Sequence, residues 1–109
     1  MSKERLYLFD TTLRDGAQTT GVDFSVAEKR RSAGVLDALG LDYVEGGYPG
    51  ANATDTQCLG EEVGLKTATL TAFGMIKRAG RSVSNDTGLQ ALLSTHAKAV
   101  CLVVKAWDY

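Results

Sequence analysis

Ala99-Val100-Cys101-Leu102-Val103-Val104 is an almost unbroken apolar run near the end of the chain. Parallel strands that are buried on both faces have this composition, whereas half-exposed strands alternate between apolar and polar residues. Working back along the chain, three more short runs have strand character, at residues 6–9, 41–45 and 67–73. The run at 99–104 therefore predicts the last and most apolar of four strands, with both of its faces buried.

The pattern between the first two strands predicts the best-defined helix. Ser25 and Glu28 form a capping box, in which the Ser oxygen accepts a bond from an N-terminal amide and the Glu side chain reaches back. The helix is expected to continue to Leu39, and Gly40 can supply a left-handed C-cap. Its buried face is predicted to contain Ala33, Leu36 and Leu39, with Lys29, Arg30 and Arg31 mostly outside.

Two further helices are predicted later in the chain. One covers residues 54–64 and is weak, because Gly60 interrupts it and glycine costs about 1 kcal/mol in a helix interior. Asp86 can cap the other, which is expected to run to about His96. The inner face of that helix is predicted to hold Leu89, Leu92 and Leu93.

Strands and helices therefore alternate along the whole chain. Such alternation predicts an α/β fold with a parallel sheet and right-handed crossovers. An open doubly wound sheet and part of an eightfold barrel both fit this order. No helical pattern follows the last strand, and a natural domain seldom leaves so apolar an edge bare. We therefore expect a fragment, or a chain completed by another chain, that self-associates through its open sheet edges.

The composition is that of an ordinary globular chain. Its 109 residues are 44% hydrophobic and 23% charged, and the net charge is −1 with both signs mixed along the sequence. This balance argues against a nucleic acid or a membrane surface as partner. There is no signal-peptide core and no run long enough for a membrane helix. Cys58 and Cys101 stand alone, so the sequence predicts a cytoplasmic protein with reduced thiols.

Two residues with chemical potential follow the first predicted strand. Arg14 and Asp15 would lie at the carboxyl end of that strand, which in a βα barrel is the catalytic rim. A carboxylate there can bind a divalent metal, and a neighbouring guanidinium offers fixed donors to a carbonyl oxygen or a carboxylate. Gly16 allows the backbone to turn sharply beside them. On spacing alone, a surface ion pair or a turn cap is the better explanation of the two residues.

The wider sequence carries a family resemblance. The decade Phe9-Asp10-Thr11-Thr12-Leu13-Arg14-Asp15-Gly16-Ala17-Gln18 resembles the first-strand signature of the family that contains isopropylmalate, homocitrate and citramalate synthases. The likeness continues at residues 21–25, 42–52, 71–78 and 105–109, and Thr19-Thr20-Gly21 with the double glycine Gly46-Gly47 is most similar to the citramalate branch. It implies the N-terminal half of a TIM (β/α)8 barrel, with about four parallel strands and three helices. Residues 1–109 would then form one incomplete catalytic domain of the pyruvate carboxyltransferase-like type, truncated after the fourth strand.

The resemblance also implies an activity and roles for single residues. Members of this family join an acetyl group from acetyl-CoA to a 2-oxo acid, and the citramalate branch uses pyruvate and forms (R)-citramalate in isoleucine biosynthesis. Asp15 matches the family's ligand to a divalent metal ion (Mg, Mn or Zn), and Arg14 matches the arginine that binds the oxo acid and polarises its carbonyl. Gln18 matches a glutamine near the reacting groups, and Glu45 an acid close to the oxo-acid site.

Several of these residues have a structural interpretation beside the functional one. Phe73 can contact the methyl group of pyruvate as a substrate-binding residue, or it can belong to the core. Glu45 can be a buried acid tied to backbone amides. Asp10 is expected to shape the loop through hydrogen bonds rather than bind a metal.

The basic residues are equally ambiguous. Lys77, Arg78 and Arg81 can contact the phosphates of CoA or form a solvated loop, and Lys105 can line the rim or simply end the last strand.

One feature of the family is missing from this sequence. The family completes its metal site with a His-x-His pair on a later strand, whereas this chain has a single histidine, His96. We expect His96 on the third helix, near the rim opposite Asp15, and not as a ligand. The metal site is therefore expected to be incomplete, and the chain alone inactive. Two alternatives stay open: another metal-dependent enzyme of the superfamily, such as a hydroxyacyl-CoA lyase, and a non-catalytic half-barrel that serves in assembly.

Overall fold

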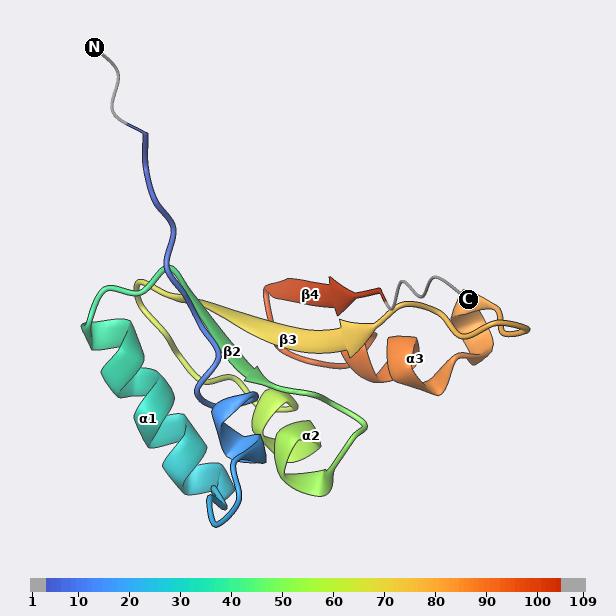
Figure 1. Ribbon diagram of the computed structural model, residues 1–109, viewed down its shortest axis with the longest axis horizontal. Coiled ribbons are helices and arrows are strands. Elements are labelled where there is room, and N and C mark those ends of the chain that lie inside the picture. Colours follow the sequence, from blue (N-terminus) through green and yellow to red (C-terminus); the bar gives the residue numbers. More distant parts are fainter. Residues whose placement is uncertain (1–3, 105–109) are drawn as a thin grey trace.

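A single parallel sheet forms the centre of the computed structural model, which describes residues 4–104 (Figure 1). The strands β1 (Phe9–Asp10), β2 (Tyr43–Gly47), β3 (Thr69–Met75) and β4 (Ala99–Val103) lie side by side in chain order, and every neighbouring pair is parallel. Helices α1 (Val26–Ala38), α2 (Ala53–Leu59) and α3 (Thr87–Leu93) connect them, with short 3-10 turns at Gly16–Gln18 (η1) and Val83–Asn85 (η2). The α/β class and the four parallel strands with three helices are confirmed.

Each helix begins where a polar side chain satisfies a free backbone amide. The Ser25 oxygen accepts from the Glu28 amide, Asn52 accepts from the amide of Asp55, and Asp86 accepts from the amide of Leu89. Such caps stabilise a helix by about 1 kcal/mol each. After α1 the chain turns through Gly40, whose φ of 88° confirms the left-handed position expected there.

The faces of the helices differ from the sequence prediction in three places. Lys29 was expected outside but is 1% exposed, because it pairs with Asp55 of the adjacent helix α2. Leu39 and Leu93 were expected inside but are each 72% exposed. Both leucines stand at a helix end, since α1 ends at Ala38 and α3 ends at Leu93.

The boundaries of several strands and of α2 also differ from the sequence prediction. The strand predicted over residues 6–9 is confined to Phe9–Asp10, and Leu6 and Leu8 are 82% and 56% exposed. The Leu8 carbonyl accepts the amides of Asp42 and Tyr43, but among the described residues no strand lies on its other side. Strands β2 and β3 begin and end later than predicted, and α2 stops at Leu59, immediately before the interrupting Gly60.

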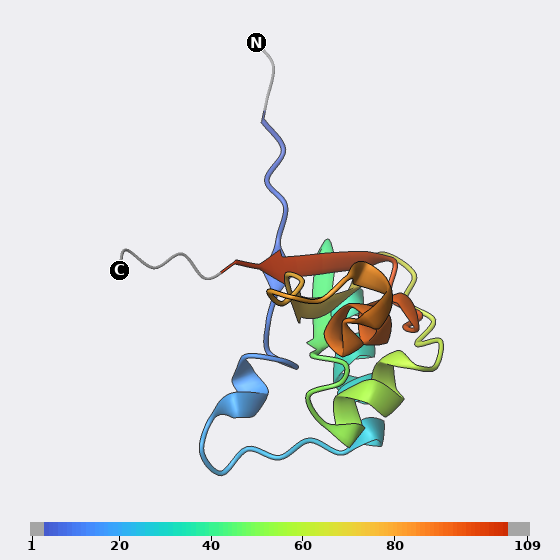
Figure 2. The same cartoon turned by 90° about the vertical axis from the view of Figure 1, so that its right-hand side faces the viewer.

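The core lies between the sheet and the one layer of helices that covers it (Figures 1 and 2). Two buried apolar clusters fill this space. The cluster under α1 contains Leu13, Ala33, Val44 and Ala68, and the cluster under α2 and α3 contains Leu59, Leu70, Ala72 and Leu92. At about 25 cal/mol per Å² of apolar surface removed from water, these clusters are the main source of stability.

A carboxylate on α1 fixes the segment that enters β3. Asp37 accepts the backbone amides of Lys66, Thr67 and Ala68 at 2.8, 2.7 and 2.6 Å. The bond from Ala68, followed by those from Lys66 and Thr67, lowers the pKa of Asp37 below its ordinary value. The start of β3 is therefore held by the helix that follows β1, not only by its neighbours in the sheet.

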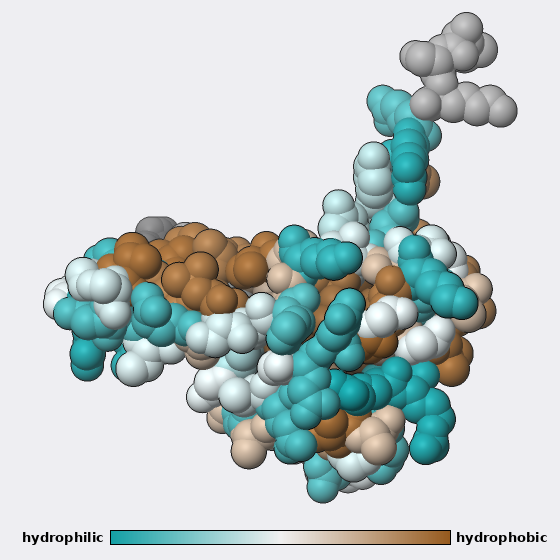
Figure 3. Space-filling model, turned by 180° about the vertical axis from the view of Figure 1, so that it is seen from behind, coloured by the Kyte–Doolittle hydropathy of each residue, from teal (hydrophilic) through white to brown (hydrophobic). Residues whose placement is uncertain are grey.

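The outer strand β4 is not buried on both faces, contrary to the prediction. Val100, Leu102 and Val103 are 48%, 51% and 36% exposed, because the helices cover one face of the sheet only. Seen from behind, apolar residues form a continuous band over this part of the molecule (Figure 3). Self-association through such edges stays a prediction. Within residues 4–104, every helix is too short or too polar to cross a lipid bilayer.

Candidate functional site

The loop that follows β1 is wound tightly enough to fix Arg14 and Asp15. The Thr11 carbonyl accepts the amides of Arg14, Asp15 and Gly16 at 3.2, 2.7 and 3.1 Å. Asp10 accepts both the amide and the hydroxyl of Thr12 at 2.9 and 3.1 Å, which confirms that it shapes the loop. These hydrogen bonds therefore fix the backbone of Arg14 at the carboxyl end of the sheet.

Arg14 contacts the next two strands at the same end. Its Nε donates to Glu45 Oε1 on β2, and its guanidinium carbon lies 4.1 Å from the centre of the Phe73 ring on β3. The side chains of Arg14 and Glu45 are 18% and 1% exposed. Three of the residues singled out in the sequence, Arg14, Glu45 and Phe73, are thus brought together from three different strand ends.

Glu45 departs from the structural interpretation offered for it. That interpretation, offered beside the functional one, was a buried acid tied to backbone amides, but the partner of Glu45 Oε1 is the Arg14 guanidinium. The other oxygen, Oε2, is buried and has no hydrogen-bond partner in the part of the chain that the structure describes. A buried acceptor without a partner costs about 1–3 kcal/mol, so the Oε2 atom of Glu45 lowers the stability of the fold.

Tyr48 extends this cluster and was not singled out from the sequence. Its ring meets the Phe73 ring edge to face, with centroids 4.9 Å apart and planes at 67°. Such pairs contribute about 0.5–1.5 kcal/mol beyond the burial of their area. The only sequence signal was its position, directly after the double glycine that ends β2. Aromatic rings therefore form one wall beside the Arg14 guanidinium.

Asp15 lies at the edge of the cluster. The Asp15 side chain is 63% exposed, and its Oδ1 stands 3.8 Å from Arg14 Nη1. Gln18 closes the exposed turn η1. The geometry leaves the Asp15 carboxylate free to bind a ligand from solvent, while the role expected for Gln18 stays a prediction.

The residues at hand do not make a complete metal site. No group of three or more His, Cys, Asp or Glu side chains that could hold a metal ion occurs within residues 4–104. A divalent ion needs four or more ligands, and Asp15 offers a single carboxylate. The Asp15 side chain can therefore act as one ligand of a metal ion.

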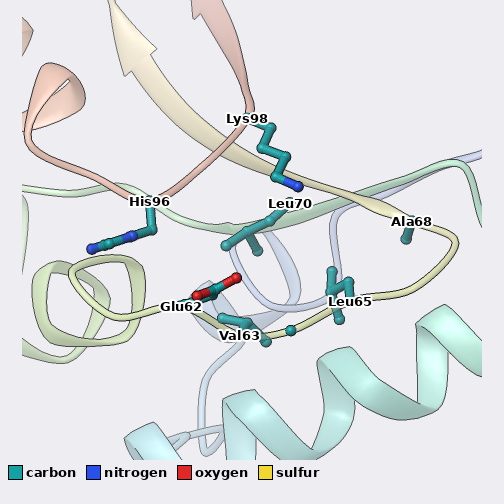
Figure 4. Close-up of a pocket in the computed structure, with 8 residues that line it drawn as sticks. Glu62, Val63, Leu65, Ala68, Leu70, His96 and Lys98 are labelled. Atoms are coloured by element: carbon teal, nitrogen blue, oxygen red, sulfur yellow. The ribbon is translucent and has the colours of Figure 1, made fainter.

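His96 lies far from this site. It was expected on the third helix, but α3 ends at Leu93, and His96 stands in the turn before β4, where its amide donates to the Leu59 carbonyl at 2.8 Å. With Glu62, Leu70 and Lys98 it lines a pocket at the amino ends of the strands (Figure 4). Because all strands are parallel, this pocket and Asp15 are at opposite ends of the sheet, as expected.

The basic loop after β3 is exposed. Lys77, Arg78 and Arg81 all face solvent. The Arg81 amide donates to the Arg78 carbonyl at 3.2 Å, Arg78 Nη2 donates to Thr87 Oγ1 at 3.5 Å, and the Arg78 amide donates to Asp86 Oδ2 at 2.9 Å. That bond, with a second from the Leu89 amide, lowers the pKa of Asp86. Contact of this loop with CoA stays a prediction, and Lys105 lies outside the described residues.

Comparison with known proteins assigns the chain to a family. Residues 5–106 match the HMGL-like family. The chain is 43% identical over 108 residues to an (R)-citramalate synthase of Streptomyces coelicolor, which covers 96% of this chain and 20% of that protein. An (R)-citramalate synthase of Aquifex aeolicus is 41% identical over 107 residues, with coverages of 96% and 20%. A 2-isopropylmalate synthase of Methylorubrum populi is 36% identical over 98 residues, with coverages of 90% and 18%.

The chain spans about a fifth of the length of these relatives. The resemblance seen in the sequence is confirmed, since the citramalate synthases match over nearly all of the chain and the isopropylmalate synthase over slightly less. The parallel βα units agree with it. Because the family model matches residues 5–106 and the parallel sheet agrees with it, the chain belongs to the HMGL-like family of TIM-barrel proteins.

Proposed function

We propose that this chain contributes the 2-oxo-acid-binding corner of a citramalate synthase, an acyltransferase that joins the acetyl group of acetyl-CoA to pyruvate. The observation that carries the proposal is the fixed position of Arg14, held between Glu45 and Phe73 where three parallel strands end. The likeness to (R)-citramalate synthases, at 41–43% identity, supports pyruvate as the oxo acid.

Arg14 has the donors that a 2-oxo acid needs. Its Nε is occupied by Glu45, so the two terminal nitrogens are the groups that can face a ligand, and one of them, Nη1, already lies beside Asp15. Two parallel N–H donors match a carboxylate, or a carboxylate and the adjacent carbonyl oxygen. Glu45 thus orients Arg14, and the guanidinium stabilises negative charge that develops on the carbonyl oxygen.

Asp15 has the part of one metal ligand in this proposal. A divalent ion, when bound, draws electron density from the oxo-acid carbonyl and makes its carbon more electrophilic. The other ligands would come from outside this cluster, because within residues 4–104 Asp15 is the exposed carboxylate that lies beside Arg14.

Phe73 and Tyr48 would set the size of the acid that fits. Their rings are already packed against each other and against Arg14, so they form a stiff apolar wall beside the donors. Pyruvate carries a methyl group at this position and 2-oxoisovalerate an isopropyl group. A rigid wall favours the smaller acid, because each extra methyl group changes the affinity by about 1–3 kcal/mol.

Titration of the chain with oxo acids tests the proposal. The arginine side chains are labelled with ¹⁵N, and the Arg14 Nε–H resonance is assigned with Arg14→Lys, which keeps the charge and removes the planar donors. Pyruvate is expected to shift this resonance saturably, with a Kd of about 1 mM, the affinity typical of a few polar contacts. 2-Oxoisovalerate is expected to bind at least about tenfold more weakly.

Two results would count against the proposal. Absence of any pyruvate-dependent shift at Arg14 would mean that this cluster does not bind oxo acids. Tighter binding of 2-oxoisovalerate than of pyruvate would instead place the site with the isopropylmalate synthases, to which the chain is also similar.

A further inference from the structure

A buried ion pair between two helices lies outside the oxo-acid site. Lys29 of α1 is 1% exposed, and its Nζ bonds to Oδ1 of Asp55 on α2, which is 7% exposed. Nothing in the proposed chemistry uses either residue. Buried pairs of this kind often contribute no more stability than apolar residues of the same size, so the pair calls for another explanation.

The second oxygen of Asp55 connects the pair to the chain that leaves β2. Asp55 Oδ2 accepts the backbone amide of Tyr48 at 2.8 Å. The Asp55 backbone is itself fixed, because its amide donates to Asn52 Oδ1 at 2.8 Å. The carboxylate therefore has one oxygen held by Lys29 and the other directed at the turn.

Gly47 makes this close approach possible. Its φ is 154°, and a Cβ atom built on it would lie 2.5 Å from Asp55 Cγ and 2.8 Å from Oδ2. No side chain fits there, so glycine lets the Asp55 carboxylate reach the backbone directly. The double glycine in the sequence thus serves the contact between β2 and α2.

The contact is transmitted to the site through two aromatic rings. Tyr48 packs edge to face on Phe73, and Phe73 lies under the Arg14 guanidinium. A shift of the Tyr48 backbone would move the Tyr48 ring, which packs against Phe73. Phe73, together with Glu45, orients Arg14. A chain of direct contacts therefore runs from Asp55 through Tyr48 and Phe73 to Arg14.

We propose that Asp55, held by Lys29, is a positioning residue for the oxo-acid site. Its Oδ2 atom accepts the Tyr48 amide and thereby fixes the aromatic wall beside Arg14. The proposal rests on the proposed function where it concerns pyruvate, but its structural part stands on the contacts alone. The decisive group is the acceptor oxygen at residue 55, and Lys29 acts by holding the carboxylate in place.

Two matched double variants separate positioning from simple stabilisation. Lys29→Met with Asp55→Asn removes both buried charges and keeps an oxygen that can accept the Tyr48 amide. Lys29→Met with Asp55→Leu removes the same charges, has a side chain of nearly the same shape as aspartate, and has no acceptor. The two differ in one hydrogen bond, and thermal unfolding checks that both are folded.

Three measurements are made on each: hydrogen exchange of the Tyr48 amide, nuclear Overhauser contacts between the Tyr48 and Phe73 rings, and pyruvate titration at Arg14. The Asn variant is expected to match the wild type within about twofold in all three. The Leu variant is expected to exchange the Tyr48 amide about tenfold faster, to weaken the ring contacts, and to bind pyruvate about tenfold more weakly, as the loss of one buried hydrogen bond implies.

Equal pyruvate affinity of the two variants would overturn the proposal, because the pair would then be purely structural. If the wild type itself does not bind pyruvate, the proposed function fails, yet the exchange rate and the ring contacts still decide whether Asp55 positions the wall. Should the Leu variant not fold, Asp55→Glu moves the carboxylate away from the Tyr48 amide while keeping its charge. It is expected to show the same three losses, and wild-type values in it would refute the proposal.

Discussion

Replacement of Arg14 by methionine tests how strongly the site is held together. The substitution keeps the length and much of the apolar volume of the side chain, but it leaves Glu45, 1% exposed, without the partner of its Oε1. Breaking a buried ion pair by removing one member costs about 3–5 kcal/mol. The lower limit applies here, because the Arg14 side chain is 18% exposed and water can enter once the guanidinium is gone.

A loss of about 3 kcal/mol is large beside the 5–15 kcal/mol typical of a domain. For a chain of this size it corresponds to a fall in Tm of roughly 12–15 °C. Urea unfolding followed by circular dichroism gives the free energy directly, and thermal melting gives the Tm. The matched control is Arg14→Met combined with Glu45→Leu, which removes both charges and is expected to return to within about 1 kcal/mol of the wild type.

The reasoning would be refuted by a loss below about 1 kcal/mol in Arg14→Met, since Glu45 would then be hydrated and the pair would behave as an exposed one. It would also be refuted if the double variant were the less stable of the two, because the cost would then come from lost contacts with Phe73 and not from an unpaired carboxylate.

Three further substitutions test the core, helix α1 and the entry to β3. Gly74→Ala would overlap Leu92 Cδ1 and place a methyl group 3.1 Å from Leu92 Cγ, so we expect a loss of about 1–3 kcal/mol in urea unfolding. Gly34→Ala on α1 has open space and should instead stabilise by about 0.5–1 kcal/mol. Asp37→Asn should destabilise at pH 7, because the folded-state pKa of Asp37 is lowered and its stabilisation is present above the unfolded pKa of about 3.9. The difference from the wild type should vanish as the pH falls through the folded pKa, and an unchanged difference at low pH would mean that the charge is irrelevant.

The alternation of strands and helices could be predicted because each element has a local cause. The Ser25 cap and the left-handed Gly40 depend on their neighbours in sequence, and both were found where expected. Helix faces were predicted less well, because burial depends on what lies opposite. The helical pattern of the sequence places the charged Lys29 on the solvent-facing side of α1. It is buried because Asp55 lies opposite it on another helix, which the sequence pattern does not reveal.

The same limit applies to the site. Arg14 and Glu45 could be named because they match residues of the synthase family, and Phe73 because it lies near the carboxyl end of a strand; parallel strands bring such residues to one edge. Tyr48 and Asp55 could not, because their roles depend on a backbone amide and on ring packing across the sheet. The two-sided burial of β4 was predicted from composition alone, and composition does not say how many helical layers are present.

The hydrogen bonds of Asp37 have a consequence for how this fold tolerates changes in chain length. Because α1 holds residues 66–68 directly, the stretch between Gly60 and Leu65 is anchored at both ends, by the end of α2 and by Asp37. Within it Val63 and Leu65 pack against the core, so extra residues are expected to be tolerated between the exposed Glu61 and Glu62. A single insertion within 66–68 is instead expected to shift the alignment of β3 against β2 and turn its inward side chains outward.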